Sequence, residues 1–277
     1  MGDANKQWQS DDVWRLLREL KHQQPDGDGE RRVTTGDATL ALSRDSGWSI
    51  TGASASQEAR TMLDQLTPVM APPGRQCVVA QIAQSLDGRT ATARGGGDRI
   101  SGDIDHQRLH RLRALSDAVV IGSTTALADA PRLTVRSVPG EQPVRVILDR
   151  SRRLPPDHPL LVDERAPSLR LAESTRHDDG HGTHAVPGME PADILSLLAQ
   201  QGLTRVLLEG GGTTVSRFLE ADCLHRLHLV VAPVLIGRGP TGLDLAPVQG
   251  MEHARRPPCH QYQLGDDVLF DMDLTPL

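Results

Sequence analysis

The sequence predicts an α/β fold in which helices cover both faces of a largely parallel sheet. Two apolar runs, CVVAQIA (77–83) and DAVVIG (117–122), lack polar alternation, which is typical of strands buried on both faces. Segments with helical periodicity separate the apolar runs, and this alternation predicts a parallel sheet. The C-terminal QYQLGDDVLFDMDL (261–274) instead predicts two strands around Gly265-Asp266, which we expect to pair antiparallel at one edge.

The beginning of the chain predicts a small extension. Ser10 can cap a helix, because the apolar residues that follow it share one face. These residues are Val13, Leu16, Leu17 and Leu20. The other expected elements are a hairpin of ATLAL (38–42) and WSITG (48–52), and a weakly helical segment at 56–66. Several prolines and a glycine punctuate the chain from Pro68 to Gly74, so we expect an extension at 1–70, of unknown role, and the main domain at 71–277.

In the main domain, the expected strands and helices alternate along the chain. The strands are expected at 77–83, 117–122, 144–149, 205–210 and 224–233. The helices are expected at 103–115, 191–202 and 212–221. Ligands of open α/β sheets bind beyond the carboxyl ends of the strands. The polar residues that follow each strand are therefore the candidate site.

Composition excludes several classes of function. The net charge of −6 argues against nucleic-acid binding, which requires a dominant basic surface. No apolar stretch is long enough to span a bilayer, and MGDANKQWQS lacks the pattern of a secretory signal. The three cysteines are far apart in the sequence, which favours a reducing, cytoplasmic setting. We therefore expect a cytoplasmic protein with no nucleic-acid or membrane partner.

The segment LLEGGGTTVSRFLE (207–220) predicts an anion site. Three glycines follow Glu209, and glycine allows a backbone to approach another molecule closely. A helix that begins here presents unpaired amides and its positive dipole end. The dinucleotide pattern G-x-G-x-x-G is not matched, so the segment alone is a weak fingerprint.

Two other polar segments follow predicted strands. Ser123, Thr124 and Thr125 crowd the start of an expected short helix, where they can cap it or hold phosphate. RSRRLP (150–155) carries three arginines within four residues. They can form a solvated face, or they can lie where the phosphate-bearing end of a cofactor rests.

Taken in order, several motifs resemble one family. They are SLDGR, HRLRALSDAVVIG, T-x-L-A-D-x-P-x-L-T-V-R, QPVRVILD, LLEGGGT and LVVAPVLIGRG. Together they resemble the reductase domain of riboflavin biosynthesis, the C-terminal half of the bifunctional deaminase–reductase, over residues 76–275. The resemblance implies a dihydrofolate-reductase-like fold. It also implies that NADPH reduces the ribosyl group of a phosphorylated aminopyrimidine to a ribityl chain.

The resemblance also implies the residues that bind the cofactor NADPH. These are Ala83, Arg99, Thr125, Asp129, Arg150, Gly211, Gly212, Thr213 and Thr214. The last four would receive the diphosphate at the start of a helix. Arg150 stands where the family often has a serine near the adenosine, and there it could pair with the 2′-phosphate and favour NADPH over NADH.

On the substrate side, the residues implied are Gly97, Arg113, Leu133, Arg136 and Glu209. Two converging arginines suit a phosphate monoester, although Arg113 alone would be interpreted as a helix-surface ion-pair residue. The mechanism we infer is direct hydride transfer to C1′ of the ring-opened imine, with Glu209 accepting hydrogen bonds from the substrate. Glu209 and Asp129 are the candidate catalytic residues, and the proton comes from Asp129 or from an ordered water.

The chain departs from the family pattern at three positions. Gln81 replaces a usual lysine, Arg99 replaces a common tryptophan, and Ala130 replaces the second aspartate of Asp-Asp-Pro. We expect these changes to alter how the substrate or nicotinamide packs. The zinc deaminase motifs His-x-Glu and Pro-Cys-x-x-Cys are absent, so we expect no deamination. The histidines of RHDDGHGTHAV (176–186) are interpreted as a solvated loop, and no metal site is expected.

Two other functions are compatible with these residues. The same fold and cofactor could serve a pterin, dihydrofolate or a specialised-pathway intermediate, although Arg113 and Arg136 favour a phosphorylated small molecule. Alternatively, the scaffold could be a non-catalytic NADPH-binding regulator. Because the family commonly dimerises through this domain, we expect a homodimer.

Overall fold

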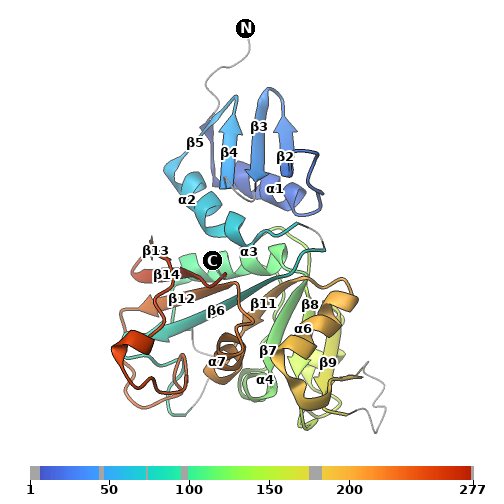
Figure 1. The fold of residues 1–277 in the computed structure, drawn as a ribbon, viewed down its shortest axis with the longest axis vertical. Coiled ribbons are helices and arrows are strands. Elements are labelled where there is room, and N and C mark those ends of the chain that lie inside the picture. The colour runs from blue at the N-terminus through green and yellow to red at the C-terminus, as the bar shows by residue number, and fades with distance from the viewer. Residues whose placement is uncertain (1–6, 44–46, 73, 95–98, 175–182, 276–277) are drawn as a thin grey trace. The chain divides into compact units, whose positions relative to one another are not determined.

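The computed structural model describes residues 7–43, 47–72, 74–94, 99–174 and 183–275. The chain forms two compact units, Met1–Gln76 and Cys77–Leu277 (Figure 1). No helix in the described ranges is both long and apolar enough to cross a bilayer.

The N-terminal unit combines two helices with a three-stranded antiparallel sheet. Its elements are β1 (Gln7–Trp8), α1 (Ser10–Leu20), β2 (Glu30–Thr35), β3 (Ala38–Ser43), β4 (Gly47–Thr51), β5 (Ser54–Ala55) and α2 (Gln57–Leu66). The strand order is β2-β3-β4, and β1 pairs separately with β5. The predicted helix, hairpin and second helix are present. Gln9 rather than Ser10 occupies the N-cap of α1, and the backbone N–H of Gln9 donates to Asp12 Oδ2 at 3.0 Å.

β2 was not predicted, because ERRVTT shows no apolar alternation. The two residues that β2 buries are Arg31 and Val33. The Arg31 guanidinium donates to the carbonyl oxygens of Leu20, at 3.2 Å, and Met70. A hydrogen-bonded arginine therefore fills an inward position where sequence reasoning requires an apolar residue.

The C-terminal unit is built on a nine-stranded sheet of order β10-β9-β8-β7-β11-β6-β12-β14-β13. The strands are β6 (Cys77–Ser85), β7 (Ala118–Gly122), β8 (Val144–Leu148), β9 (Ser168–Ala172), β10 (Thr183–Ala185), β11 (Arg205–Glu209), β12 (Arg226–Ala232), β13 (Cys259–Leu264) and β14 (Asp267–Asp273). All neighbouring pairs are parallel except those of β14 with β12 and β13. The α/β class, the largely parallel sheet and its antiparallel C-terminal edge are confirmed.

Helices lie on both faces of this sheet. They are α3 (Asp103–Leu115), α4 (Ser123–Asp129), α5 (Pro159–Val162), α6 (Pro191–Gln200) and α7 (Gly212–Glu220). On one face, Val78 and Ala80 of β6 share a core with Ile194 of α6 and Phe218 of α7. On the other face, Gln81 contacts α3, because successive residues of a strand point to opposite faces.

The face of the sheet beneath α3 carries a row of buried polar residues. Register aligns Glu209 of β11 with Gln81 of β6, Gln81 with His228 of β12, and His228 with Asp271 of β14. All four residues are at most 9% exposed. Since buried polar groups require partners, this row determines which residues of α3 pack above it.

Candidate active site

β11 and α7 meet at a glycine corner that packs against helix α4 and against the loop that contains Thr241. Gly210 has φ +128°, a conformation that side chains rarely adopt. A Cβ at Gly211 would lie 2.9 Å from Thr125 Oγ1, and a Cβ at Gly212 would overlap the carbonyl oxygen of Thr241. The Gly211 amide donates to Thr125 Oγ1 at 3.0 Å. Contacts within the protein therefore require glycine here, a cause that the sequence interpretation missed.

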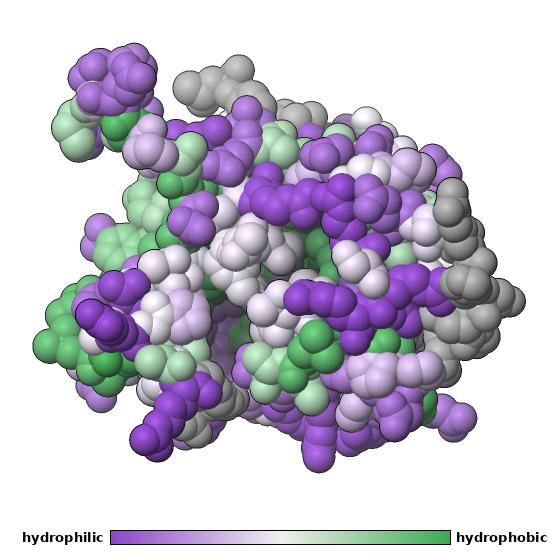
Figure 2. Space-filling model, turned by 90° about the horizontal axis from the view of Figure 1, so that it is seen from below, coloured by the Kyte–Doolittle hydropathy of each residue, from purple (hydrophilic) through white to green (hydrophobic). Residues whose placement is uncertain are grey.

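The structure brings several predicted cofactor residues together at this corner. They are Thr125, Gly211, Gly212, Thr213 and Thr214. In the described part of the chain, the backbone amides of Gly212 and Thr213 have no acceptor, as expected at the start of a helix. Such amides favour an anion. α4 and α7 both follow carboxyl ends of parallel strands (Figure 1), and Figure 2 shows a largely hydrophilic surface with a hollow near its centre.

A buried ion pair occupies the end of β11. Arg113 of α3 donates through Nε and Nη2 to the two carboxylate oxygens of Glu209, each at 2.6 Å. The two residues are 6% and 9% exposed, respectively. Burial lowers the pKa of Arg113, but the Glu209 carboxylate outweighs this effect and raises it above its ordinary value. The predicted substrate residues Arg113 and Glu209 thus neutralise each other in a bidentate pair.

Side chains of α3 and of Gln142 fix the loop 133–136, which contains the predicted Leu133 and Arg136. Leu133 is 2% exposed and has φ +53°. Gln142 holds Val135 at both backbone groups, accepting from its amide at 2.7 Å and donating to its carbonyl at 2.8 Å. The Arg136 amide donates to Nδ1 of buried His110 at 3.1 Å. The loop therefore presents Arg136 from a fixed backbone.

The Arg136 side chain is exposed and, among the described residues, pairs with no carboxylate. Burial lowers its pKa, and the neighbouring charges of Arg113 and Arg132 lower it further. Burial, followed by the charges of Arg113 and Arg136, also lowers the pKa of His110 to about 3. Within the described part of the chain, Arg136 therefore differs from Arg113 in having no carboxylate partner for its guanidinium.

The remaining predicted residues differ in their surroundings. Ala83 is half-buried in β6 beside Val230. Arg99 is exposed and pairs with Asp103 at 2.9 Å. Asp129 is the exposed last residue of α4, and partial burial raises its pKa. Gly97 lies outside the described residues.

The arginines that follow β8 have different partners. Arg150 donates to both carboxylate oxygens of Glu173, at 2.8 and 3.2 Å, in an exposed ion pair. Arg153 Nη2 donates to Ser123 Oγ and Thr124 Oγ1, each at 2.9 Å. Arg150, the residue expected to bind the 2′-phosphate, therefore has a carboxylate partner, whereas Arg153 contacts hydroxyl groups.

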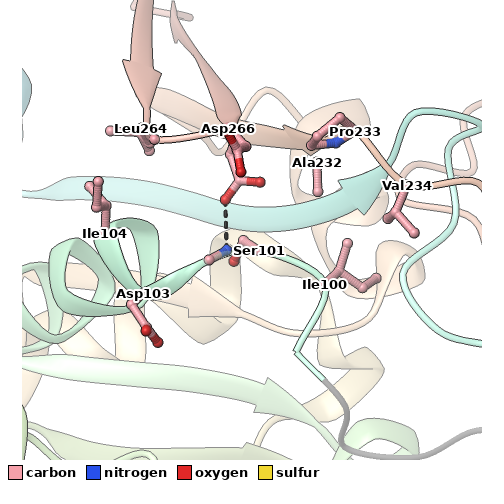
Figure 3. A pocket seen from close by; sticks show the side chains of 12 residues that line it. Ile100, Ser101, Asp103, Ile104, Ala232, Pro233, Val234, Leu264 and Asp266 are labelled. Carbon is pink, nitrogen blue, oxygen red and sulfur yellow. Dashed lines mark hydrogen bonds between the residues drawn. The ribbon is translucent and has the colours of Figure 1, made fainter.

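A cavity of about 380 Å³ lies elsewhere in the C-terminal unit (Figure 3). Ile100, Ser101 and Ile104, at and before the start of α3, face the hairpin residues Leu264 and Asp266 across it. None of the predicted site residues lines the cavity. Within the described ranges, no group of three or more His, Cys, Asp or Glu side chains could hold a metal. Most of the segment 176–186 lies outside those ranges.

Comparisons with known proteins match this unit. The RibD C-terminal domain family matches residues 76–270. The 2,5-diamino-6-ribosylamino-4(3H)-pyrimidinone 5′-phosphate reductase of Methanothermobacter thermautotrophicus is 34% identical over 216 residues, which cover 71% of this chain and 97% of that protein. RibD of Mycobacterium tuberculosis H37Rv is 37% identical over 183 residues, which cover 65% of this chain.

A solved structure agrees. Acinetobacter baumannii RibD superposes with a TM-score of 0.65 at 26% identity, covering 80% of this chain and 65% of that one. The chain spans only 48% of the length of the M. tuberculosis protein. From the family match and the relatives, the chain belongs to the RibD C-terminal domain family.

Proposed function

We propose that this reductase uses NADPH to reduce the ribosyl C1′ of a phosphorylated ribosylaminopyrimidine. The observation that carries the proposal is the uncompensated guanidinium of Arg136 beside the buried Glu209–Arg113 pair. A phosphate monoester is the ligand that such a guanidinium favours. The relative from M. thermautotrophicus, matched over 97% of its length, acts on a phosphorylated pyrimidine according to its name.

The glycine corner fits the diphosphate of NADPH. The amides of Gly212 and Thr213 have no acceptor in the described chain, and they open a helix of 9 residues. The Thr125 contact to Gly211 fixes the corner beside α4. We assign Thr214 and Gly211 to the walls of this site. When bound, NADPH supplies the hydride, and the protein aligns the reacting carbons and excludes water.

The residues near the reacting carbons receive the roles of positioning and proton transfer. Glu209 is held by Arg113, so its carboxylate is oriented to accept hydrogen bonds from the substrate. Leu133 and Gly97 complete the substrate side, and Ala83 and Arg99 the nicotinamide side. Asp129, whose pKa partial burial raises, is the candidate for the residue that transfers the proton.

A turnover assay tests the proposal. Purified protein is mixed with NADPH and either 5-amino-6-(5-phosphoribosylamino)uracil or its 2,5-diaminopyrimidinone counterpart, and loss of absorbance by reduced nicotinamide is followed. We expect turnover of at least one of the two. With Arg136→Gln, KM should rise on the order of 10-fold or more for the phosphorylated substrate, because a charged hydrogen bond is lost.

The dephosphorylated substrate is the matched control. It should be turned over poorly by the wild type, and Arg136→Gln should change its KM little. Binding of NADPH without oxidation by either pyrimidine would contradict the proposal. If Arg136→Gln raised KM equally for the phosphorylated and the dephosphorylated substrate, Arg136 would not be the residue that binds the phosphate.

We also infer that catalysis resides in residues 71–277, that the protein is cytoplasmic, and that it forms a homodimer. In the structure, none of the three cysteines, all of which are described, forms a disulfide, which suits a reducing compartment. Light scattering during size-exclusion chromatography measures the mass. A value near the 30.0 kDa of one chain would contradict the dimer.

A further inference from the structure

Two sequence motifs without a proposed binding role meet in the structure. SLDGR (85–89) begins at the last residue of β6, and LVVAPVLIGRG (229–239) runs from β12 into the loop that follows it. β6 and β12 are parallel neighbours in the sheet, so the loops that leave their carboxyl ends lie side by side. We call residues 86–92 loop A and residues 234–242 loop B. None of the residues assigned to the cofactor or the substrate lies in either loop.

The Asp87 carboxylate joins the two loops. Its Oδ1 accepts from the backbone N–H of Ile236 at 3.1 Å, and its Oδ2 accepts from that of Gly237 at 2.6 Å. The Ser85 hydroxyl also donates to Oδ1, at 2.5 Å. These donors, of which the Ser85 hydroxyl has the largest effect, lower the pKa of Asp87 to about 2. Near neutral pH the carboxylate is therefore ionised, and it holds loop B through charge-assisted hydrogen bonds.

Backbone hydrogen bonds hold the far end of loop B against loop A. The Gly242 N–H donates to the carbonyl oxygen of Gly88 at 3.0 Å, and the Thr90 N–H donates to that of Pro240 at 2.9 Å. The turn at Asp87 thus holds loop B near its start through a carboxylate and at its end through the backbone.

The end of loop B lies directly against the start of α7. A Cβ at Gly212 would lie 2.4 Å from the carbonyl oxygen of Thr241 and 2.6 Å from that of Gly242. Just beyond loop B, the Asp244 N–H donates to Oγ of Ser216, a buried residue of α7, at 2.8 Å. Loop B therefore forms one wall of the glycine corner.

We propose that Asp87 is a positioning residue for the cofactor, because its carboxylate fixes loop B and loop B keeps the glycine corner in the conformation that binds the diphosphate. Asp87 acts through the loop, since the amides of Ile236 and Gly237 already occupy its two oxygens. A small displacement of the corner matters, because hydrogen bonds weaken steeply outside a narrow range of distance and angle. The inference rests on the proposed function for the identity of the ligand.

Titrations of the full chain with NADPH and with ADP, which carries a diphosphate without nicotinamide, test the assignment. Asp87→Ala should weaken both ligands on the order of 10-fold, because two hydrogen bonds to a charged group no longer hold loop B. Asp87→Asn keeps one acceptor oxygen and should weaken both by about threefold. In turnover, KM for NADPH should rise by the same factors, while kcat and KM for the pyrimidine stay within about twofold.

Asp26→Ala is the matched control. Asp26, in the N-terminal unit, is also a turn carboxylate that accepts from two backbone N–H groups, those of Asp28 and Glu30, each at 3.0 Å. This variant should leave the affinities for NADPH and ADP unchanged. Hydrogen exchange measures the position of the loop directly. Exchange in residues 234–246 and 211–216 should become faster in Asp87→Ala and remain at the wild-type rate in Asp26→Ala.

Each other outcome decides the question. Faster exchange of loop B with unchanged affinity for both ligands would show a merely structural role and overturn the inference, while the proposed function would stand. Weaker binding of NADPH with unchanged binding of ADP would also overturn it, because loop B would then act away from the diphosphate. Binding of both ligands that depends on Asp87, in a protein that turns over neither pyrimidine, would support the inference and remove the proposed function. If Asp87→Ala does not fold, wild-type affinity of Asp87→Asn for both ligands overturns the inference.

Discussion

Replacing Arg108 with methionine should strongly destabilise the C-terminal unit. Arg108 of α3 is 2% exposed and lies above the polar row of the sheet. Its Nη2 and Nε lie 2.9 and 3.2 Å from Asp105 Oδ1, and its Nη1 lies 3.0 Å from His228 Nδ1. The guanidinium also donates to Gln81 Oε1. One side chain therefore links α3 to β6 and β12.

The size of the expected destabilisation follows from the unpaired carboxylate that Arg108→Met leaves in the interior. Methionine can occupy most of the volume, but the carboxylate of Asp105, which is 1% exposed, loses its cation. Its remaining contacts are the Ser101 hydroxyl at 2.7 Å and the Gln81 amide at 3.5 Å. Removing one partner of a buried ion pair costs about 3–5 kcal/mol. At about 2–4 °C per kcal/mol, Tm should fall by roughly 6–20 °C.

Thermal unfolding followed by circular dichroism measures the change, and hydrogen exchange of α3 assigns it to the C-terminal unit. Arg255→Met is the control, since an exposed ion pair contributes about 0–1 kcal/mol. Adding Asp105→Leu to Arg108→Met should recover part of the loss, because it removes the unpaired carboxylate. An Arg108→Met protein as stable as the control would refute the reasoning, and a double variant no better than the single one would refute its electrostatic cause.

Three further results are expected. Gln81→Lys restores the residue usual in the family, yet it should cost on the order of 3 kcal/mol in urea unfolding, because Arg108 already places a buried cation there; wild-type stability would contradict this. Gly212→Ala should weaken NADPH binding in calorimetry and lower the free energy of unfolding by about 1–3 kcal/mol, because the new Cβ overlaps a backbone carbonyl. Burial, as the largest cause, lowers the pKa of His110 to about 3 and also lowers that of His228. On acidification, both histidines are protonated in the unfolded state before they are protonated in the folded state. The free energy of unfolding is therefore at its full value above about pH 6.5, and below that pH it falls by up to about 1.4 kcal/mol per pH unit for each histidine. Urea unfolding at pH 7.5 and 5.5 measures this slope, which His110→Gln should flatten.

Several elements were predicted from the sequence with bounds close to those observed. The expected helix 103–115 has the observed bounds, and the expected strand 205–210 ends one residue earlier, at Glu209. β9 was missed because Arg170 interrupts its apolar run. The arginine is buried there only because Asp149, distant in sequence, neutralises it. Local periodicity cannot reveal such a partner.

The candidate site shows the same division between local and long-range information. Motifs located the glycine corner and the loop 133–136, because both are contiguous in sequence. They did not indicate that Thr125 occupies the space beside Gly211, or that Gln142 holds Val135. The first of these contacts joins segments that meet only when the sheet forms, and the second depends on the conformation of a single loop. A motif therefore predicts which segment of the chain forms a site, whereas the packing around that segment determines how rigidly its backbone is held.

The availability of each arginine depends on its counter-charge, and this determines the binding chemistry of the site. Arg113 and Arg136 both match the family pattern, but Glu209 neutralises Arg113, whereas Arg136 has no carboxylate partner among the described residues. Likewise, Glu173 neutralises Arg150, while Arg153 contacts only hydroxyls among the described side chains. A paired guanidinium must lose its carboxylate before it can bind a phosphate, whereas an uncompensated one has no such competitor. We therefore expect a phosphate to bind the arginine of each pair that has no carboxylate partner.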